Sequence, residues 1–384
     1  MTEKFDRVLH IITVCLTVCF IFGFAVAFWL TPDKSFSEQE NRYLQQLPKL
    51  ESETFLSGEW MTEIGEYYAD QFPMRNTFMG IRAMSELALG KMQNNDVVIG
   101  SDGYLVAREY NPDYTTLEKN LKALRTFATK MEGQNIPCTI ALAGRTVDVM
   151  TEVLPPLYPT DVDDNLWKTA LDMVKDQHVL DLRTSLRELN QAKVGQLYYF
   201  TDHHWTSLGA YYGYSNIVES WGITPMGLDY FNVTQVSDAF YGTTWSSAGT
   251  SWVKPDSMEF FRYQGDMDYT TYIQDTGVSF DGFYDMSYLE QKDKYSSFIS
   301  GNNGLVTVTA KGEEERETLL LIKDSFAHSM VPFLAIHYDL VIVDMRYYVN
   351  TLGSLIEEYG VDRALVMVNM ETLIDTYQFG LLTK

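Results

Sequence analysis

The sequence is poor in cysteine, in histidine and in basic side chains. Of its three cysteines, Cys15 and Cys19 fall in one apolar run near the N-terminus and Cys138 alone lies beyond it. An intrachain disulfide and a cysteine metal cluster are therefore excluded from the rest of the chain. With 29 Lys and Arg against 52 Asp and Glu, the formal net charge is -23. That balance argues against binding to nucleic acid and against a polybasic contact with anionic lipid.

Residues 8–30 contain no Asp, Glu, Lys or Arg. Roughly 20 apolar residues cross a bilayer, so this run is long enough to span one. Lys4 and Arg7 precede it, and positive residues stay on the cytoplasmic side. We therefore expect a single-pass anchor with the N-terminus inside and the rest of the chain outside the cell membrane. The alternative is a signal peptide cleaved after Ala27, because Ala25 and Ala27 have the small-x-small spacing of a cleavage site; the protein would then be secreted.

The chain is 46% hydrophobic, enough for a substantial core. We expect three parts: residues 1–31 form the cytoplasmic tip and anchor, 32–95 a helical linker or packing region, and 96–384 an α/β domain. Within the second part, apolar residues at three- and four-residue spacing predict two amphipathic helices that are separated near Pro73.

From residue 96 onward, short apolar runs alternate with helix-like stretches. This alternation predicts a mostly parallel sheet with helices on both faces, in which functional residues follow the strands directly. Residues of about 224–303 interrupt it with a β-rich, aromatic insertion whose rings we expect to pack its own core rather than to stack on sugars. The predicted strands are 136–143, 178–182, 195–200, 318–322, 338–344 and 363–369, and the clearest helices 117–133 and 166–177.

A loop that reads TDHHWTS follows the third predicted strand. Asp202 and His204 are two residues apart, so in an extended loop their side chains point the same way and His203 points the opposite way. An aspartate that accepts a hydrogen bond from one ring nitrogen fixes the histidine tautomer and leaves the other nitrogen free as a base. Thr206 or Ser207 then caps the helix that follows.

A candidate nucleophile lies in the segment LLLIKDSFAHSMVP. Ser325 follows a predicted strand and a tight turn and begins a helix that breaks near Pro332. In this strand-turn-helix setting a serine hydroxyl stands at the sheet edge, close to helix-start amides that can stabilise an oxyanion. Taken alone, Ser325 is more simply a helix cap; the Asp202–His204 pair favours the nucleophile. His328, one turn later, is a rival base.

Two more polar residues follow neighbouring predicted strands. Arg346 comes after the strand 338–344 and would hold an anionic or polar substrate group. Asn369 ends the strand 363–369, and its amide would donate to an oxyanion. Either residue also fits an ordinary strand end.

Six segments together resemble the DHHW protein family of bacteria: ENRYLQQLPKL, EYYADQFPMRN, SDGYL, TDHHWT, YGTTW and LLLIKDSFAHSMVPFL. The resemblance covers nearly the whole chain after the apolar run. That family is similar to the SGNH-hydrolase superfamily and to the membrane-associated proteins that O-acetylate alginate, so it implies a flavodoxin-like α/β fold. By residue, Asp202 and His204 match the relatives' Asp-x-His pair, Ser325 matches the nucleophile, and Asn369 falls where the oxyanion asparagine would be sought.

The sequence departs from the superfamily pattern around the oxyanion hole. Lys323 replaces the glycine before Asp-Ser, the Asp-x-x-His spacing is shortened to Asp-x-His, and no Gly-x-Asn-Asp block follows. We place five residues among the candidate oxyanion or substrate-binding groups: Asn369, Arg346, Lys323, His203 and Trp205.

These features favour a membrane-anchored, extracytoplasmic serine O-acyltransferase or esterase, most simply for O-acetyl groups, that acts on a cell-surface polysaccharide or other envelope glycan. A catalytically inactive glycan-binding or assembly factor is the alternative. By resemblance, a membrane partner would supply the acyl group, and no cofactor is expected. A metal site at Asp202, His203 and His204 is a third interpretation, disfavoured because adjacent histidines rarely bind one ion; we predict none.

Overall fold

The computed structural model describes residues 2–37, 39–40, 42–108, 111–250, 252–312 and 315–383, without the side chains of residues 2–4. The chain forms two compact units, residues 1–91 with 249–252 and residues 92–248 with 253–384. The division into anchor, linker and α/β domain with bounds at 31 and 95 stays a prediction.

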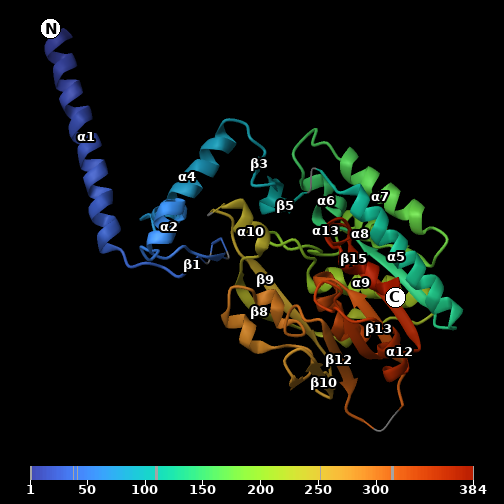
Figure 1. Ribbon diagram of the computed structural model, residues 1–384. Coiled ribbons are helices and arrows are strands. Elements are labelled where there is room, and N and C mark those ends of the chain that lie inside the picture. The colour runs from blue at the N-terminus through green and yellow to red at the C-terminus, as the bar shows by residue number, and fades with distance from the viewer. Residues whose placement is uncertain are drawn as a thin grey trace. The chain divides into compact units, whose positions relative to one another are not determined.

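The first unit begins with a single long helix, α1 (Thr2–Leu30) (Figure 1). Its segment Phe5–Leu30 has a mean hydropathy of 2.7 and is long and apolar enough to cross a membrane, by length and composition. The two amphipathic helices expected on either side of Pro73 are present as α3 (Glu59–Asp70) and α4 (Arg75–Ala88). The further elements of this unit are β1 (Phe36–Ser37), β2 (Arg42–Tyr43), α2 (Ser52–Ser57), α3 (Glu59–Asp70) and α4 (Arg75–Ala88).

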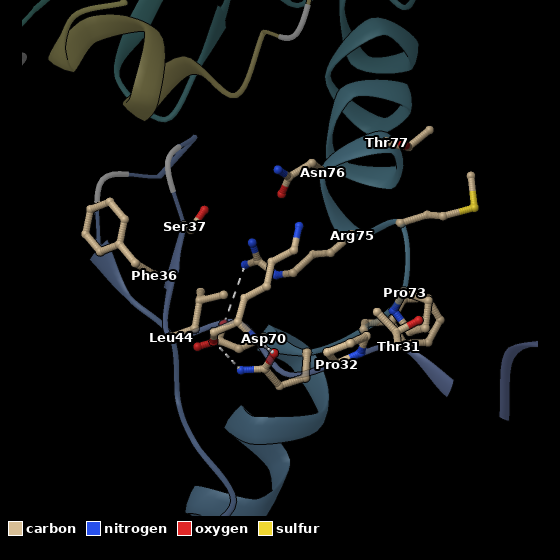
Figure 2. Close-up of a pocket in the computed structure, with 14 residues that line it drawn as sticks. Thr31, Pro32, Phe36, Ser37, Leu44, Asp70, Pro73, Arg75, Asn76 and Thr77 are labelled. Carbon is tan, nitrogen blue, oxygen red and sulfur yellow. Dashed lines mark hydrogen bonds and ion pairs between the residues drawn. The ribbon is translucent and has the colours of Figure 1, made fainter. Parts of the chain in front are cut away.

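A cavity of about 520 Å³ lies in this unit, between the chain that follows α1 and the start of α4 (Figure 2). The Gln71 side chain closes one wall, since it accepts from the Lys34 N–H at 2.9 Å and donates to the Lys34 carbonyl at 3.0 Å. Arg75 and Asp70 face each other across it, 3.9 Å apart. Among the described residues that line it there is no histidine and no cysteine.

The second unit is built on an eight-stranded sheet with the order β11-β10-β12-β14-β13-β15-β6-β7. Strands β10, β12, β13 and β15 of this sheet are labelled in Figure 1. The five strands from β14 to β7 are parallel, whereas β11, β10 and β12 run antiparallel to their neighbours. This confirms the mostly parallel α/β sheet. The strands are β6 (Cys138–Ala143), β7 (Val179–Asp181), β10 (Tyr269–Ile273), β11 (Val278–Asp281), β12 (Leu305–Ala310), β13 (Thr318–Lys323), β14 (Asp339–Val343) and β15 (Arg363–Asn369).

Helices cover both faces of the sheet. Successive residues of a strand point to opposite faces, so each strand contributes side chains to the core on either side. In β13, Leu319 and Leu321 enter the core beneath α9 (Ser207–Ser220) and α11 (Val331–Leu334). Leu320 and Ile322 enter the core on the other face, beneath α5 (Tyr114–Gly133), α7 (Asp161–Val174), α12 (Gly353–Tyr359) and α13 (Met370–Asp375). The helices of this unit are α5 (Tyr114–Gly133), α6 (Thr146–Val149), α7 (Asp161–Val174), α8 (Leu182–Gln191), α9 (Ser207–Ser220), α10 (Thr243–Ala248), α11 (Val331–Leu334), α12 (Gly353–Tyr359) and α13 (Met370–Asp375).

The strand order places one edge of the sheet where ligands are expected. The next two parallel strands along the chain pair with opposite sides of β13: β14 on one side and β15 on the other. Where the strand order changes direction in this way, a crevice forms beyond the carboxyl ends of the strands. Ser325, Arg346 and Asn369 directly follow or end β13, β14 and β15. The three residues therefore meet at that edge, as their positions after predicted strands indicated.

The β-rich segment joins this sheet, since its hairpin of β10 and β11 pairs with β12. One strand prediction is wrong: residues 195–200 form only an isolated bridge between Tyr198 and Trp205, because the chain turns back after six residues. Short strands and 3-10 turns complete the unit: β3 (Gln93–Asn94), β4 (Val97–Ile99), β5 (Leu105–Ala107), β8 (Asn232–Phe240), β9 (Asp256–Arg262), η1 (Ser101–Gly103), η2 (Thr151–Val153), η3 (Leu228–Tyr230), η4 (Met286–Glu290), η5 (Lys294–Ser297), η6 (Ser325–Met330) and η7 (Gln378–Thr383).

Candidate active site

Ser325 is the first residue of η6, a 3-10 helix that gives way to α11 at Val331, next to Pro332, where the predicted helix was expected to break. The preceding Asp324 is fully buried and ties two strand ends together. One of its carboxylate oxygens accepts from the Phe326 N–H at 2.9 Å and the other from the Asn369 N–H at 2.7 Å. Asp324 thus fixes the turn that presents the Ser325 hydroxyl at the carboxyl edge of the sheet.

The loop that carries His204 is a narrow hairpin braced by one distant carboxylate. Asp256, at the start of β9, is 1% exposed. It accepts hydrogen bonds from the Phe200 and Thr201 amides, both at 2.8 Å, and from the Thr201 hydroxyl at 2.6 Å. Burial raises the pKa of Asp256, which these bonds partly offset. Thr206 caps α9 through the Gly209 N–H, as predicted.

Asp202, His204 and Ser325 form a continuous hydrogen-bonded chain. The carboxylate of Asp202 lies 2.5 Å from His204 Nδ1, and His204 Nε2 lies 2.8 Å from Ser325 Oγ. The second carboxylate oxygen of Asp202 accepts two hydrogen bonds from Thr243, one from its backbone amide at 2.8 Å and one from its hydroxyl at 3.2 Å. All three members of the chain are buried. The predicted pair and the predicted nucleophile therefore lie within proton-transfer distance of one another.

The electrostatics of this chain favour a neutral imidazole. Burial, with a smaller effect of His203, lowers the pKa of His204 from 6.5 to about 4, although Asp202 opposes the shift. Burial raises the pKa of the Asp202 carboxyl, but His204, His203 and the Thr243 amide together bring it below its ordinary value. At neutral pH, His204 can therefore accept a proton at Nε2 while Asp202 holds Nδ1–H.

Tyr295, from η5 in the β-rich segment, stacks on the imidazole of His204. Its ring lies 3.9 Å from that of His204, with 8° between the planes. The Tyr295 hydroxyl donates to the Ser325 carbonyl at 3.1 Å and lies 3.1 Å from the Ser329 hydroxyl. The sequence shows no local signal for this residue, which is one of 25 tyrosines. Thr243 is also missed, although it belongs to the YGTTW segment.

A cavity of about 160 Å³ opens at Ser325 and is lined by Asn369 and Arg346. The Asn369 side-chain oxygen accepts a hydrogen bond from the Thr372 N–H at 3.1 Å and so caps α13. The side-chain NH2 of Asn369 is then the group that can donate to an oxyanion. The Phe326 N–H is committed to Asp324 and is not such a donor. Arg346 makes a bidentate contact with Asp344, at 2.9 and 2.6 Å, so its guanidinium is held at the cavity wall.

Three of the expected binding residues differ from their predicted placement. His203 does line the cavity, but its ring lies 3.8 Å from that of His204 and does not point the opposite way, because the loop bends and is not extended. Trp205 is fully buried and donates to the Phe326 carbonyl at 2.8 Å, so it locks the two loops together. Lys323 lies outside the cavity, with its ammonium 3.0 Å from Asp344.

The other histidines of the second unit contact groups away from Ser325. His328 Nε2 lies 2.7 Å from the Lys323 ammonium, and burial together with Lys323 lowers its pKa well below the ordinary value. His328 therefore serves as the acceptor for that lysine and not as the base for Ser325. His178 Nδ1 lies 3.0 Å from the Thr139 hydroxyl, and His337 Nε2 lies 2.7 Å from a tyrosine hydroxyl.

Asp202, His203 and His204 also bring possible metal-ligand atoms within 4.8 Å of one another. In the observed arrangement both ring nitrogens of His204 are engaged, one by Asp202 and the other by Ser325. His203 Nδ1 lies 2.6 Å from the Thr243 hydroxyl. A metal ion would have to displace the triad hydrogen bonds to reach His204, so these residues fit a hydrogen-bonded chain better than a metal centre.

Two protein-family models match the chain. The model described as DHHW protein matches residues 169–344, which include Asp202, His204 and Ser325. A second, described as the SGNH hydrolase-like domain of acetyltransferase AlgX, matches residues 97–231. These matches confirm the resemblance to the DHHW family and to SGNH hydrolases.

Among curated proteins, the probable alginate O-acetylase AlgJ of Pseudomonas putida is 25% identical over 174 residues. The match covers 44% of this chain and 44% of that protein, so the chain spans less than half of the relative's length.

Solved structures show the same fold. A DHHW family protein from Eubacterium siraeum superposes with a TM-score of 0.63 at 19% identity, over 75% of this chain and 95% of that one. PatB1 of Bacillus cereus superposes with a TM-score of 0.61 at 17% identity, over 74% and 98%. PatB1 has also been solved with a sulfonyl adduct.

Proposed function

We propose that this chain, with its DHHW-family region at residues 169–344, is a serine-dependent O-acetyltransferase of envelope polysaccharide. The observation that carries the proposal is the buried chain from Asp202 through His204 to Ser325, with contacts of 2.5 and 2.8 Å. The likeness to an AlgX-type acetyltransferase domain and to a probable alginate O-acetylase supports acetyl as the group transferred.

In the first half of the reaction, His204 Nε2 removes the proton from Ser325 Oγ, and the oxygen attacks the carbonyl carbon of an acetyl ester. The tetrahedral oxyanion accepts a hydrogen bond from the amide nitrogen of Asn369, a residue that lines the same cavity. The bond to the leaving alkoxide breaks as His204 returns the proton to it. Asp202 holds Nδ1–H throughout and stabilises the imidazolium that forms in between.

The second half reverses these steps with another alcohol. An acceptor hydroxyl gives its proton to His204 Nε2, and its oxygen attacks the carbonyl carbon of acetyl-Ser325. The bond to Oγ breaks, and Oγ takes the proton back from His204. If water attacks instead, the same apparatus is an esterase, so the selectivity between acceptor and water decides the outcome.

The proposed location follows from α1. With Arg7 directly before the uncharged residues 8–30 of this helix, the catalytic unit would lie outside the cell membrane, held by a single span. Acetyl groups would then reach it from a membrane partner. Proteolysis of intact cells that removes the catalytic unit and spares a membrane-bound N-terminal fragment would support this topology, and a mature N-terminus at residue 28 would show cleavage instead.

The test uses the full chain in detergent, with p-nitrophenyl acetate and with phenylmethylsulfonyl fluoride. We expect release of p-nitrophenol and a single sulfonyl adduct by intact mass, both abolished by Ser325→Ala, and turnover abolished by His204→Ala. A folded parent chain that shows neither reaction would refute the proposal and favour the glycan-binding or assembly function.

A further inference from the structure

A cavity of about 500 Å³ lies in the second unit, apart from the one at Ser325. Three tyrosine rings line it, those of Tyr230, Tyr263 and Tyr269, together with several polar side chains. A volume between about 300 and 1,000 Å³ and a lining of aromatic rings with a few polar groups are typical of ligand-binding pockets. The residues of this cavity take no part in the chain from Asp202 to Ser325, so it is a separate candidate site.

This cavity lies at the amino-terminal edge of the parallel strands, opposite the catalytic edge. Arg316 precedes β13, whereas Ser325 follows it. β13 has six residues, and a strand rises about 3.3 Å per residue, so the two sites are about 20 Å apart. Tyr269 and Ala310, which pair across β10 and β12, also line the cavity. A single ligand that reaches both sites must therefore be a polymer several units long.

The exposed part of the aromatic wall is the ring of Tyr230, in η3. It is 43% exposed, whereas Tyr263 and Tyr269 are 8% and 9% exposed. The Tyr230 ring lies 5.5 Å from that of Tyr263, with 34° between the planes, so a buried ring backs the exposed one. The body of a tyrosine side chain is apolar and its hydroxyl is polar. A ring held in this way can stack on the C–H face of a sugar while its hydroxyl binds the sugar's polar groups.

The polar groups beside this ring have unused hydrogen-bonding capacity. Within the described residues, the side chains of Gln264 and Asp268 make no hydrogen bond and no ion pair, and both are exposed. The Tyr230 hydroxyl has no hydrogen-bond partner there either. A carboxylate only accepts, whereas an amide and a hydroxyl both donate and accept. Together they can accept from the hydroxyls of a sugar and donate to its oxygens, which an apolar ligand would leave unsatisfied.

Arg316 adds a donor that is already held in place. Its Nε lies 3.1 Å from Asp339, and its Nη2 donates to the carbonyl of Ala335 at 2.6 Å. Its guanidinium carbon lies 5.9 Å from the centre of the Tyr269 ring. Within the part of the chain that the structure describes, these contacts leave Nη1 without a partner. A donor that is fixed before binding loses little conformational entropy when a ligand arrives.

We propose that this cavity is a docking site for a hydroxyl-rich sugar chain and that it holds the polysaccharide substrate at a distance from Ser325. The chemistry of the ligand rests on the cavity itself, whereas its identity as the substrate rests on the proposed function. Tyr230 stacks on one sugar ring. Asp268, Gln264 and Arg316 bind the hydroxyls of that ring or of the next. A polymer bound here raises the effective concentration of its other units at the catalytic site.

Binding is measured with the full-length Ser325→Ala chain, in a detergent without a sugar headgroup. Equilibrium dialysis compares hexasaccharides of glucose, of N-acetylglucosamine and of glucuronate, with free glucose as the short ligand. We expect at least one hexasaccharide to bind at least about tenfold more tightly than glucose, because a cavity of about 500 Å³ is larger than a single sugar ring.

Two variants locate the bound sugar. Tyr230→Leu keeps an apolar side chain and removes the flat ring, and Asp268→Ala removes an exposed carboxylate. Each should weaken hexasaccharide binding by about tenfold, and Asp268→Ala should leave the urea midpoint unchanged. The controls are Tyr114→Leu and Asp172→Ala, at exposed positions of α5 and α7 that do not line this cavity, and they should leave binding unchanged.

No binding of any hexasaccharide would overturn the inference, as would binding no tighter than that of glucose or binding that neither variant weakens. Turnover of p-nitrophenyl acetate by the parent chain tests the proposed function separately. Sugar binding that depends on Tyr230 and Asp268, in a chain without Ser325-dependent turnover, would refute the chemistry and keep the docking site.

Discussion

The imidazole of His204 lies flat against the phenol ring of Tyr295, with ring centroids 3.9 Å apart and 8° between the planes. The hydroxyl of the same tyrosine donates to the carbonyl of Ser325. One side chain therefore contacts both the ring of His204, the proposed base, and the backbone of Ser325, the proposed nucleophile. We infer that Tyr295 is a positioning residue, since it contacts the two groups that exchange the proton and neither reacts nor lines the cavity at Ser325.

Replacing Tyr295 should separate its two contacts. Tyr295→Phe keeps the stacked ring and loses one hydrogen bond, so we expect a loss of about 1 kcal/mol of unfolding free energy and a small change in kcat. Tyr295→Leu frees the imidazole, and kcat should fall by roughly 10- to 100-fold with little change in KM. Steady-state kinetics with p-nitrophenyl acetate and urea unfolding measure these effects.

The matched control is Tyr288→Leu, in the same segment of the chain but outside the stack, which should leave kcat unchanged. If Tyr295→Leu lowers stability and yet retains the parent kcat at a temperature where it is folded, Tyr295 only supports the fold.

The pH dependence of turnover should show the effect of burial on His204. The proposed mechanism needs the neutral imidazole, so kcat/KM should be highest above the pKa of His204 and should fall as the pH drops through that pKa. That pKa is lowered from 6.5 to about 4, first by burial and then by His203. We expect the acidic limb of kcat/KM well below pH 6, and His203→Gln should move it upward. An acidic limb near 6.5 that is the same in both proteins would contradict this account.

The sheet edge could be predicted because each of its polar residues directly follows a continuous apolar run. β13, β14 and β15 are buried on both faces and so read as short uninterrupted hydrophobic segments. The carboxyl ends of parallel strands meet at one edge, which brings Ser325, Arg346 and Asn369 together without further information. The Asp202–His204 spacing supplied the other half of the site.

The rest of the site depends on contacts between distant segments, which carry no local pattern. Asp256 and Tyr295 are, respectively, one of 52 acidic residues and one of 25 tyrosines, and each meets its partner only through the folded chain. The prediction that the His203 side chain points away from His204 was wrong, because it assumed an extended loop. Lys323 was misplaced because a lysine before a nucleophile suggests an exposed cation, whereas here it is 2% exposed.

Asp256 should be essential to the catalytic loop. Its carboxylate accepts from the buried Thr201 amide and hydroxyl and from the Phe200 amide. Asp256→Ala leaves these donors unpaired, at a cost of about 1–3 kcal/mol for each buried group. We expect a lower urea midpoint and a lower kcat. Asp238→Ala, at an exposed position of β8, is the control and should change neither; retention of the parent midpoint in Asp256→Ala would show that the loop does not need this brace.

Chelators should not reduce activity. With Nδ1–H held by Asp202, the lone pair of the ring is on Nε2, and it already accepts the Ser325 O–H, so a metal ion would have to displace that hydrogen bond. We expect equal turnover before and after dialysis against EDTA, and less than stoichiometric metal by elemental analysis. Loss of activity that added zinc or manganese restores would revive the metal site at Asp202, His203 and His204.

Lys323 should stabilise the fold through charges buried beneath the nucleophile. Its ammonium lies 3.0 Å from Asp344 and 2.7 Å from His328, and Asp344 in turn orients Arg346 at the cavity. Lys323→Met removes one of the two cations that contact Asp344, which keeps Arg346, and leaves buried His328 Nε2 without its donor, so it should destabilise the chain by about 1–3 kcal/mol. The exposed Lys175→Met is the control, with little expected change.

Coupling to Asp344 decides between a charge effect and simple packing. If the ion pair is the cause, Asp344→Asn should cost much less stability in the Lys323→Met background than in the parent, because the lysine it would leave unpaired is already gone. Additive losses would mean that the methylene stem of Lys323 matters and its charge does not. Asp344→Asn also removes the carboxylate that holds Arg346, both in the parent and in the Lys323→Met background. If KM rises in these two proteins but not in Lys323→Met alone, Arg346 positions the substrate and Lys323 contributes to stability.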